Sequence, residues 1–211
     1  MKVWLFRLVG VVLSAVLLTL AFPTVDWGWL AWVGLVPLLL AVRSASRPRL
    51  GCLIGLVWGA CFYGVLLWWM QQFVARWTGS FWLGLIAWGA LVLSQTLFAE
   101  LFGWAFALVN ARMRGSSLPV LWTAALWVAV EWLRGAGGWG FLWGQLAVSQ
   151  YRYLLPLQSA ELLGAWGLSA WMMLVNAAIA EALARRKWRP LLLPLEVSLL
   201  LLLFGWWRLS L

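Results

Sequence analysis

The sequence predicts an all-α integral membrane protein, built as a bundle of about seven transmembrane helices. Apolar residues make up 65% of the 211 residues, and only 10% are charged. A soluble domain carries about 25% charged residues, so this chain has too little polar surface to cover itself in water. The 21 tryptophans fit the same class, because indole rings favour the level of the lipid headgroups.

Seven apolar stretches are long enough to be candidate spans, for which about 17–25 residues are needed. The first ends before Pro23, which cannot continue a helix. The second and fifth are short, and the fourth is long enough to tilt in the bilayer. In chain order the expected spans are residues 3–22, 27–42, 50–70, 81–109, 118–133, 161–183 and 191–207.

Small residues on the third stretch predict a close helix contact. Gly51, Gly55 and Gly59 are four residues apart, so they share one face of a helix. A face without side chains lets a second helix approach at short distance. We therefore expect tight packing inside the bundle along this face.

Basic residues set the expected orientation. Four of the 15 basic residues lie on one side of the predicted bundle, namely Arg76, Arg134, Arg152 and Arg208. The other 11 lie on the opposite side, which the positive-inside rule makes cytoplasmic. The N-terminus is then cytoplasmic, the C-terminus lies outside, and the segments 71–80 and 134–160 are outer loops. The same rule explains the net charge of +9, so no nucleic-acid partner is expected.

The start of the 134–160 loop is the candidate recognition site. Glu131 and Arg134 are three residues apart, which predicts that they meet on one face of the fifth helix. Two interpretations stay open. Either the pair only anchors that end of the helix, or Arg134 binds a phosphate or carboxylate group while Glu131 holds it in place.

The loop itself is rich in glycine and aromatic residues. Trp139, Phe141 and Trp143 offer large apolar faces, and Gly140 permits unusual backbone shapes. A re-entrant or interfacial hairpin is one solution, since irregular backbone is tolerated at membrane depth only against protein or water. Simple aromatic anchoring at the interface is the other.

The sequence shows no self-sufficient catalytic site. There is no histidine, which excludes His-based metal sites and His-dependent triads, and neither a metal nor a cofactor is expected. Cys52 and Cys61 are nine residues apart on one helix, too far for a disulfide. Glu100 is the one carboxylate deep in a predicted span. It is either functional or close to the inner surface.

Ordered motifs along almost the whole chain resemble one family. They are LAFP at 20–23, WLAWVGLVPLLL at 29–40, GLVWG at 55–59, FYG at 62–64, WW at 68–69, EWLR at 131–134, GFLW at 140–143, SQ at 149–150, GAWGLS at 164–169 and VNAA at 175–178. In this order the set resembles the N-terminal membrane domain of apolipoprotein N-acyltransferases.

The resemblance implies a role at the outer face of a bacterial inner membrane, in a multi-pass protein. Members of the family transfer an acyl chain from a phospholipid, typically phosphatidylethanolamine, to the N-terminal cysteine of a diacylated lipoprotein. Phospholipid and diacylated apolipoprotein are therefore the implied partners. The implied binding residues are Glu131, Arg134, Gly140, Phe141, Trp143, Ser149 and Gln150.

Two departures from the family pattern affect this expectation. Leu142 stands where the family usually has proline. No residue here corresponds to the Glu-Lys-Cys triad of the family's nitrilase-like domain, so no catalytic residue is expected in this chain, and that domain becomes a possible separately encoded partner. Two alternatives stay open: a non-catalytic lipid-binding scaffold, and a small transporter. The transporter is disfavoured because the two halves show no repeat.

Overall fold

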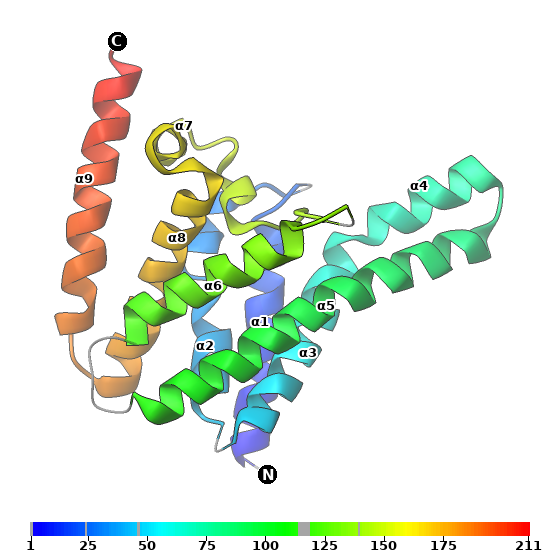
Figure 1. Ribbon diagram of the computed structural model, residues 1–211, viewed down its shortest axis with the longest axis horizontal. Helices are drawn as coiled ribbons and strands as arrows, with labels where there is room; N and C mark the ends of the chain where they lie inside the picture. Colours follow the sequence, from blue (N-terminus) through cyan, green and yellow to red (C-terminus); the bar gives the residue numbers. More distant parts are fainter. Residues whose placement is uncertain (1, 24, 46, 114–118, 139) are drawn as a thin grey trace.

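The computed structural model describes residues 2–23, 25–45, 47–113, 119–138 and 140–211, and within them it contains helices and no strand. In chain order the elements are α1 (Lys2–Leu20), η1 (Gly28–Trp32), α2 (Val36–Arg43), α3 (Pro48–Leu66), α4 (Trp68–Thr78), α5 (Phe81–Arg112), α6 (Pro119–Gly135), η2 (Leu146–Gln150), α7 (Leu154–Leu157), α8 (Ser159–Arg185), η3 (Arg189–Leu191) and α9 (Leu192–Leu209). Figure 1 shows the two termini at opposite ends of the molecule.

Four described helical stretches are long and apolar enough to cross a membrane, and they are Pro48–Leu66, Phe81–Arg112, Ser159–Arg185 and Arg189–Leu209. Two shorter apolar stretches, Trp4–Leu20 and Gly28–Arg43, accompany them. The all-helical membrane class predicted from composition is confirmed. The fifth predicted span began at Leu118, which lies outside the described residues.

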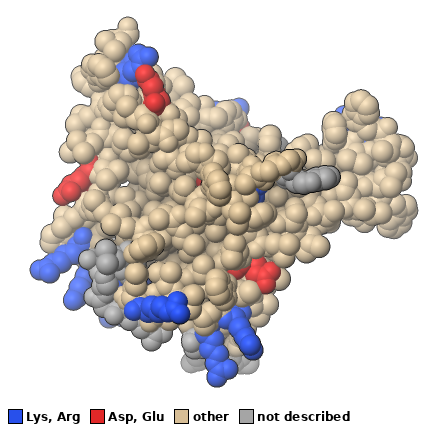
Figure 2. Space-filling view, in the orientation of Figure 1, with Lys and Arg blue, Asp and Glu red and all other residues tan. Residues whose placement is uncertain are grey.

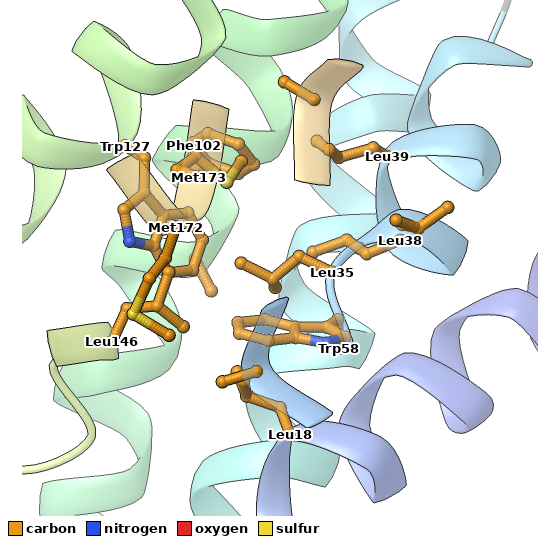
Figure 3. Close-up of a cluster of buried hydrophobic side chains, with 14 of the residues drawn as sticks. Leu18, Leu35, Leu38, Leu39, Trp58, Phe102, Trp127, Leu146, Met172 and Met173 are labelled. Atoms are coloured by element: carbon orange, nitrogen blue, oxygen red, sulfur yellow. The ribbon is translucent and has the colours of Figure 1, made fainter. Parts of the chain in front are cut away.

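The centre of the bundle is apolar and rich in aromatic rings (Figure 3). The buried Trp58 ring of α3 stacks on Phe62 with ring centroids 5.0 Å apart, and its edge faces Trp127 of α6 at 6.2 Å. The indole nitrogen of Trp58 donates a hydrogen bond to Ser14 Oγ at 3.1 Å. A large ring with its one polar atom satisfied can therefore be buried among α1, α3 and α6.

The predicted glycine face of the third helix is confirmed. Gly51 and Gly55 of α3 lie against Gly103 and Ala99 of α5, so close that a Cβ atom added at Gly55 would overlap the Ala99 carbonyl oxygen. Backbone packed on backbone joins α3 to α5 along most of their shared length. Because α5 extends beyond this contact, its N-terminal half projects from the bundle (Figure 1).

The segment 71–80 was expected to be a loop, and that prediction is wrong. The helix predicted over 50–70 ends at Leu66, and a new helix, α4, runs from Trp68 to Thr78. It ends at Gly79, whose φ of 70° is the left-handed helix-capping conformation. Together, α4 and the first half of α5 form a helical hairpin, which we call the arm (Figure 1).

The helix predicted over 27–42 is also wrong as a single element, because it is broken between η1 and α2. The Asn176 side chain of α8 forms hydrogen bonds with backbone groups at the break. Its Oδ1 accepts a hydrogen bond from Leu35 N, and its Nδ2 donates one to Ala31 O, both at 2.9 Å. Pro37 has no backbone N–H, so it cannot donate the hydrogen bond that would extend α2 toward η1.

The last two predicted spans correspond to α8 and to η3 with α9. α8 is interrupted at Gly164, where φ of 65° and ψ of −178° are open to glycine alone. The 134–160 loop between α6 and α8 contains η2 and α7, so it is more ordered than expected. α9 lies at the edge of the bundle against α7 and α8 (Figure 1).

Charge is concentrated at the end of the molecule that holds the N-terminus (Figure 2). There, the buried Glu181 of α8 forms ion pairs with Arg43 of α2 and Arg185 of its own helix. The second of these joins residues four apart, which are neighbours on the surface of one helix. Cys52 and Cys61 are free thiols, as expected.

Replacing Gly55 with alanine tests the α3–α5 contact. The added Cβ overlaps the α5 backbone, so we expect Gly55→Ala to lower the unfolding free energy by about 1–3 kcal/mol, measured by thermal unfolding in detergent. Gly89→Ala is the matched control in α5, because a Cβ there meets open space. Equal stability of the two variants would contradict the close contact.

Replacing Asn176 with leucine tests the break between η1 and α2. In Asn176→Leu, Leu35 N and Ala31 O lose their hydrogen-bond partner. Each unsatisfied buried group lowers the unfolding free energy by about 1–3 kcal/mol. Thermal unfolding of Asn176→Leu should show a much larger loss than that of Asn110→Leu. Asn110 is also buried, but with the described residues its side chain makes one long hydrogen bond, of 3.5 Å to Arg43 O. Equal losses would show that Asn176 has no special role.

Candidate functional site

The C-terminal end of α6 carries two buried charged residues. Glu131 is 3% exposed, and its Oε1 accepts hydrogen bonds from Trp127 Nε1 at 2.9 Å and from Leu146 N at 2.8 Å. The second bond joins α6 to the first residue of η2. A carboxylate oxygen thus satisfies a backbone donor that the 3₁₀ turn leaves free.

Arg134 is equally buried, at 3% exposure. Its Nη1 donates to the Tyr63 hydroxyl at 2.5 Å and to Trp143 O at 3.3 Å. The guanidinium also lies over the Tyr63 ring, 5.5 Å from the centroid, in cation–π geometry. Arg134 therefore connects α3, α6 and the loop, and its Nε remains a buried donor without a partner among the described residues.

The expected direct pairing of Glu131 with Arg134 is not found. Within the described part of the chain no ion pair joins the two side chains, although both line one small cavity between α3, α5 and α6. Each side chain forms hydrogen bonds with other partners instead. The direct hydrogen-bond partners of the two side chains are the loop backbone, the Trp127 indole N–H and the Tyr63 hydroxyl.

The loop turns back sharply after α6. Phe141 N donates to Arg134 O at 3.1 Å, and a Cβ added at Gly140 would overlap the Gly135 carbonyl, so only glycine fits there. The half-buried Phe141 packs against the core. Trp139, the third aromatic residue predicted for this loop, lies outside the described residues.

Trp143 is the predicted site residue that the loop leaves most open. Its side chain is 43% exposed, and its ring lies 5.4 Å from that of Trp69 at the root of the arm. Its carbonyl oxygen is the acceptor for Arg134. The backbone of Trp143 is therefore held by a buried charge, while its ring is presented on the surface.

Ser149 and Gln150 lie elsewhere, buried in η2. Gln150 Nε2 donates to Gly28 O at 2.7 Å, and its Oε1 accepts from Trp32 Nε1 at 3.0 Å. Ser149 Oγ donates to Leu146 O at 2.7 Å. Gln150 therefore attaches η2 to η1, whereas the bond of Ser149 stays within η2. Both residues share the loop with Trp143 but offer no free surface.

A second polar cluster fixes the far end of the loop. Asp26, whose φ is 64°, forms an ion pair with Arg152 at 3.2 Å and accepts a hydrogen bond of 2.7 Å from the Tyr151 hydroxyl. That hydrogen bond raises the pKa of Tyr151 above its ordinary value, because deprotonation would place two negative charges together. The hydroxyl therefore stays a donor at neutral pH.

Glu100 lies far from this loop. Its Oε1 accepts a hydrogen bond from Cys52 Sγ at 2.9 Å, one turn from the start of α3 and beside the basic end of the bundle. Among the described residues no cluster of three or more His, Cys, Asp or Glu side chains is placed to hold a metal ion.

Several contributors to the site were not predicted. Tyr63 is 71 residues from Arg134, Trp69 is 74 residues from Trp143, and Gly28 is 122 residues from Gln150. Tyr63 and Trp69 lie in motifs of the same resemblance, whereas Gly28 lies just before one and carried no sequence signal. Spacing along the chain carries no information on such distant contacts.

Comparison with known proteins agrees with the resemblance. Residues 14–178 match the family model described as the apolipoprotein N-acyltransferase N-terminal domain. Relatives named apolipoprotein N-acyltransferase include proteins of Gloeobacter violaceus, 37% identical over 202 residues, and of Geobacter metallireducens, 33% identical over 196. These matches cover 92% and 91% of this chain but only 37% of each relative, so the chain spans little more than a third of their length.

Substitution of Glu131 tests whether its oxygen holds the loop. Glu131→Leu removes the acceptor of Leu146 N, so we expect hydrogen exchange in the segment 146–150 to accelerate by about tenfold or more. Glu131→Gln keeps a carbonyl oxygen in place and should exchange nearly as slowly as the unmodified protein. Mass spectrometry of peptides from this segment measures both. Unchanged exchange in Glu131→Leu would contradict the role assigned to the hydrogen bond.

Proposed function

The chain belongs to the apolipoprotein N-acyltransferase family, and we propose that it acts as the membrane domain that binds a phospholipid acyl donor and a diacylated lipoprotein for N-acylation. The proposal rests on family membership and on the form of the loop that follows α6. In it, α1, η1 with α2, α3, α5, α6, α8 and α9 make seven crossings of a bacterial inner membrane. The basic end faces the cytoplasm, and the loop lies outside.

The single observation that carries this function is the placement of Trp143. The exposed indole of Trp143 lies next to Trp69, and the two rings form an aromatic surface. In the proposal, this surface is at the level of the outer headgroups. Acyl chains and aromatic rings associate through apolar contact, while an indole N–H remains free for polar groups. Such a surface suits a lipid that enters from the bilayer.

The remaining site residues act through the loop. Arg134 and Glu131 are buried and bonded to backbone atoms of Trp143 and Leu146, so their role in the proposal is to position Trp143. Gln150 holds η2 against η1, Ser149 bonds within η2, and Gly140 permits the turn. Of the two earlier interpretations of Arg134, anchoring is therefore the one that the contacts favour.

The chemistry of acyl transfer is assigned, in this proposal, to a nitrilase-like domain beyond these 211 residues. In that domain a cysteine thiolate would take the acyl group from the phospholipid ester and release the lysophospholipid. The lipoprotein amine would then attack the thioester, form the amide and release the cysteine. The chain described here would keep both acyl-bearing substrates at the membrane surface. Positioning of this kind can contribute several kcal/mol to a reaction barrier.

Truncation of Trp143 tests the function. Trp143→Ala should weaken phospholipid binding by about tenfold, measured by lipid titration of the purified protein in detergent, because one aromatic contact of roughly 1.4 kcal/mol is lost. Thermal unfolding should change little, since the ring is half exposed. Trp206→Ala is the control, because Trp206 is an exposed tryptophan on a different element, α9.

Two outcomes contradict the proposal. Equal losses of lipid affinity in both variants would show general membrane anchoring by tryptophan. A loss of stability parallel to the loss of binding would make Trp143 a packing residue. N-acylation of a diacylated peptide, assayed with a nitrilase-like domain of a relative added, separates an acyltransferase from a non-catalytic scaffold, since only the former gives product.

A further inference from the structure

An apolar groove with one buried charge lies between α1 and α3, at the end of the bundle opposite to Trp143. Its walls come from Leu8 and Val11 of α1 and from Leu53, Ile54 and Val57 of α3, and Arg7 lines it as well. Its volume of about 510 Å³ is in the range of ligand-binding pockets. We propose that this groove binds an anionic phospholipid, with an acyl chain along the apolar walls and the phosphate group at Arg7.

The charge of Arg7 is held in place without a counterion. Arg7 is only 8% exposed; its Nε donates to Ser44 Oγ at 2.9 Å and its Nη2 to Ser44 O at 2.6 Å. The guanidinium also lies 5.5 Å from the ring centroid of Trp4. Both partners are neutral, so they orient the guanidinium and leave its positive charge unbalanced.

No carboxylate among the described residues pairs with Arg7. The chain has six acidic residues, and the described contacts place five of them with other partners: Asp26 with Arg152, Glu100 with Cys52, Glu131 with Trp127 and Leu146, Glu161 with Arg208, and Glu181 with Arg43 and Arg185. The sixth, Glu196, is exposed on α9, which packs against α7, α8 and η3. An anion from outside the chain is therefore the natural counterion.

The chemistry of Arg7 favours phosphate. A guanidinium binds phosphate oxygens through directed N–H groups, and an unpaired charge beside hydrocarbon is costly. Arg7 Nη1 has no described hydrogen bond and is not enclosed, so it is the edge that can meet a ligand. One net negative charge on the ligand balances one positive charge on the protein.

The groove argues for a lipid over a free anion. Residues 4–11 of α1 extend for about 10 Å along the helix. A phosphate ion has no hydrocarbon part that could contact an apolar wall of that length, whereas a lipid acyl chain has. The groove also lies toward the end of the molecule where lysine and arginine gather (Figure 2). Basic pockets between helices at such an end are typical of anionic lipid sites. This site is independent of the function proposed for the Trp143 loop.

Native mass spectrometry of the detergent-solubilised protein tests the proposal. Phosphatidylglycerol should bind about tenfold more tightly than phosphatidylcholine with the same acyl chains, because only the former carries net charge. Arg7→Gln should remove this preference, and Arg7→Lys should retain most of it. Arg189→Gln is the matched control, an exposed basic residue at the same end of the bundle, and should bind like the unmodified protein.

A second pair of variants tests the groove without changing Arg7. Leu53→Trp places a large ring in the groove and should weaken phosphatidylglycerol binding by about tenfold. Leu56→Trp changes a similarly exposed leucine of α3 that does not line the groove, so it should bind normally.

Three results would overturn the site. They are equal affinity for the two lipids, equal behaviour of Leu53→Trp and Leu56→Trp, and displacement of phosphatidylglycerol by excess inorganic phosphate. The last would indicate a site for a free anion.

Discussion

The structure depends on one constraint: polar groups buried in an apolar bundle must find partners within the protein. Glu131 Oε1 and Arg134 Nη1 at the end of α6 meet this requirement by bonding to the loop that follows. Leu146 N and Trp143 O, two backbone groups of an irregular segment, are satisfied by side chains whose own burial would otherwise be costly. The same contacts satisfy both the buried side chains and the loop backbone, and the loop consequently has a defined shape.

The same constraint explains the other departures from simple helices. Asn176 of α8 supplies a donor and an acceptor to the break between η1 and α2, and Gln150 joins η1 to η2. The irregular backbone on this side of the bundle is therefore held by buried amide side chains. On the other side, the arm is supported by backbone packing of α3 on α5 and by a hydrogen bond of 3.0 Å from Trp88 Nε1 to Gly64 O.

The parts of the fold that could be predicted from sequence are those governed by local pattern. Apolar length located most helices, and the spacing of Gly51, Gly55 and Gly59 predicted a close helix contact. The break at residues 33–35 could not be predicted, because its stabilising partner is some 140 residues away. The segment 71–80 was misassigned since its polar residues suggested a loop, whereas without an interior glycine or proline it continues as helix up to Gly79. Proximity of Glu131 to Arg134 on a helix predicted a pair, but backbone acceptors and donors nearby proved better partners.

The account's central claim is that buried charges at the end of α6 present Trp143 to lipid. The most direct measurement places a photo-crosslinking aromatic amino acid at position 143 of the membrane-embedded protein, with and without the substitution Arg134→Met. The account predicts a phospholipid adduct at position 143 that is strongly reduced by Arg134→Met, while an adduct at position 206 is unaffected by it. Absence of a lipid adduct at position 143, or equal yields with and without Arg134, would contradict the claim.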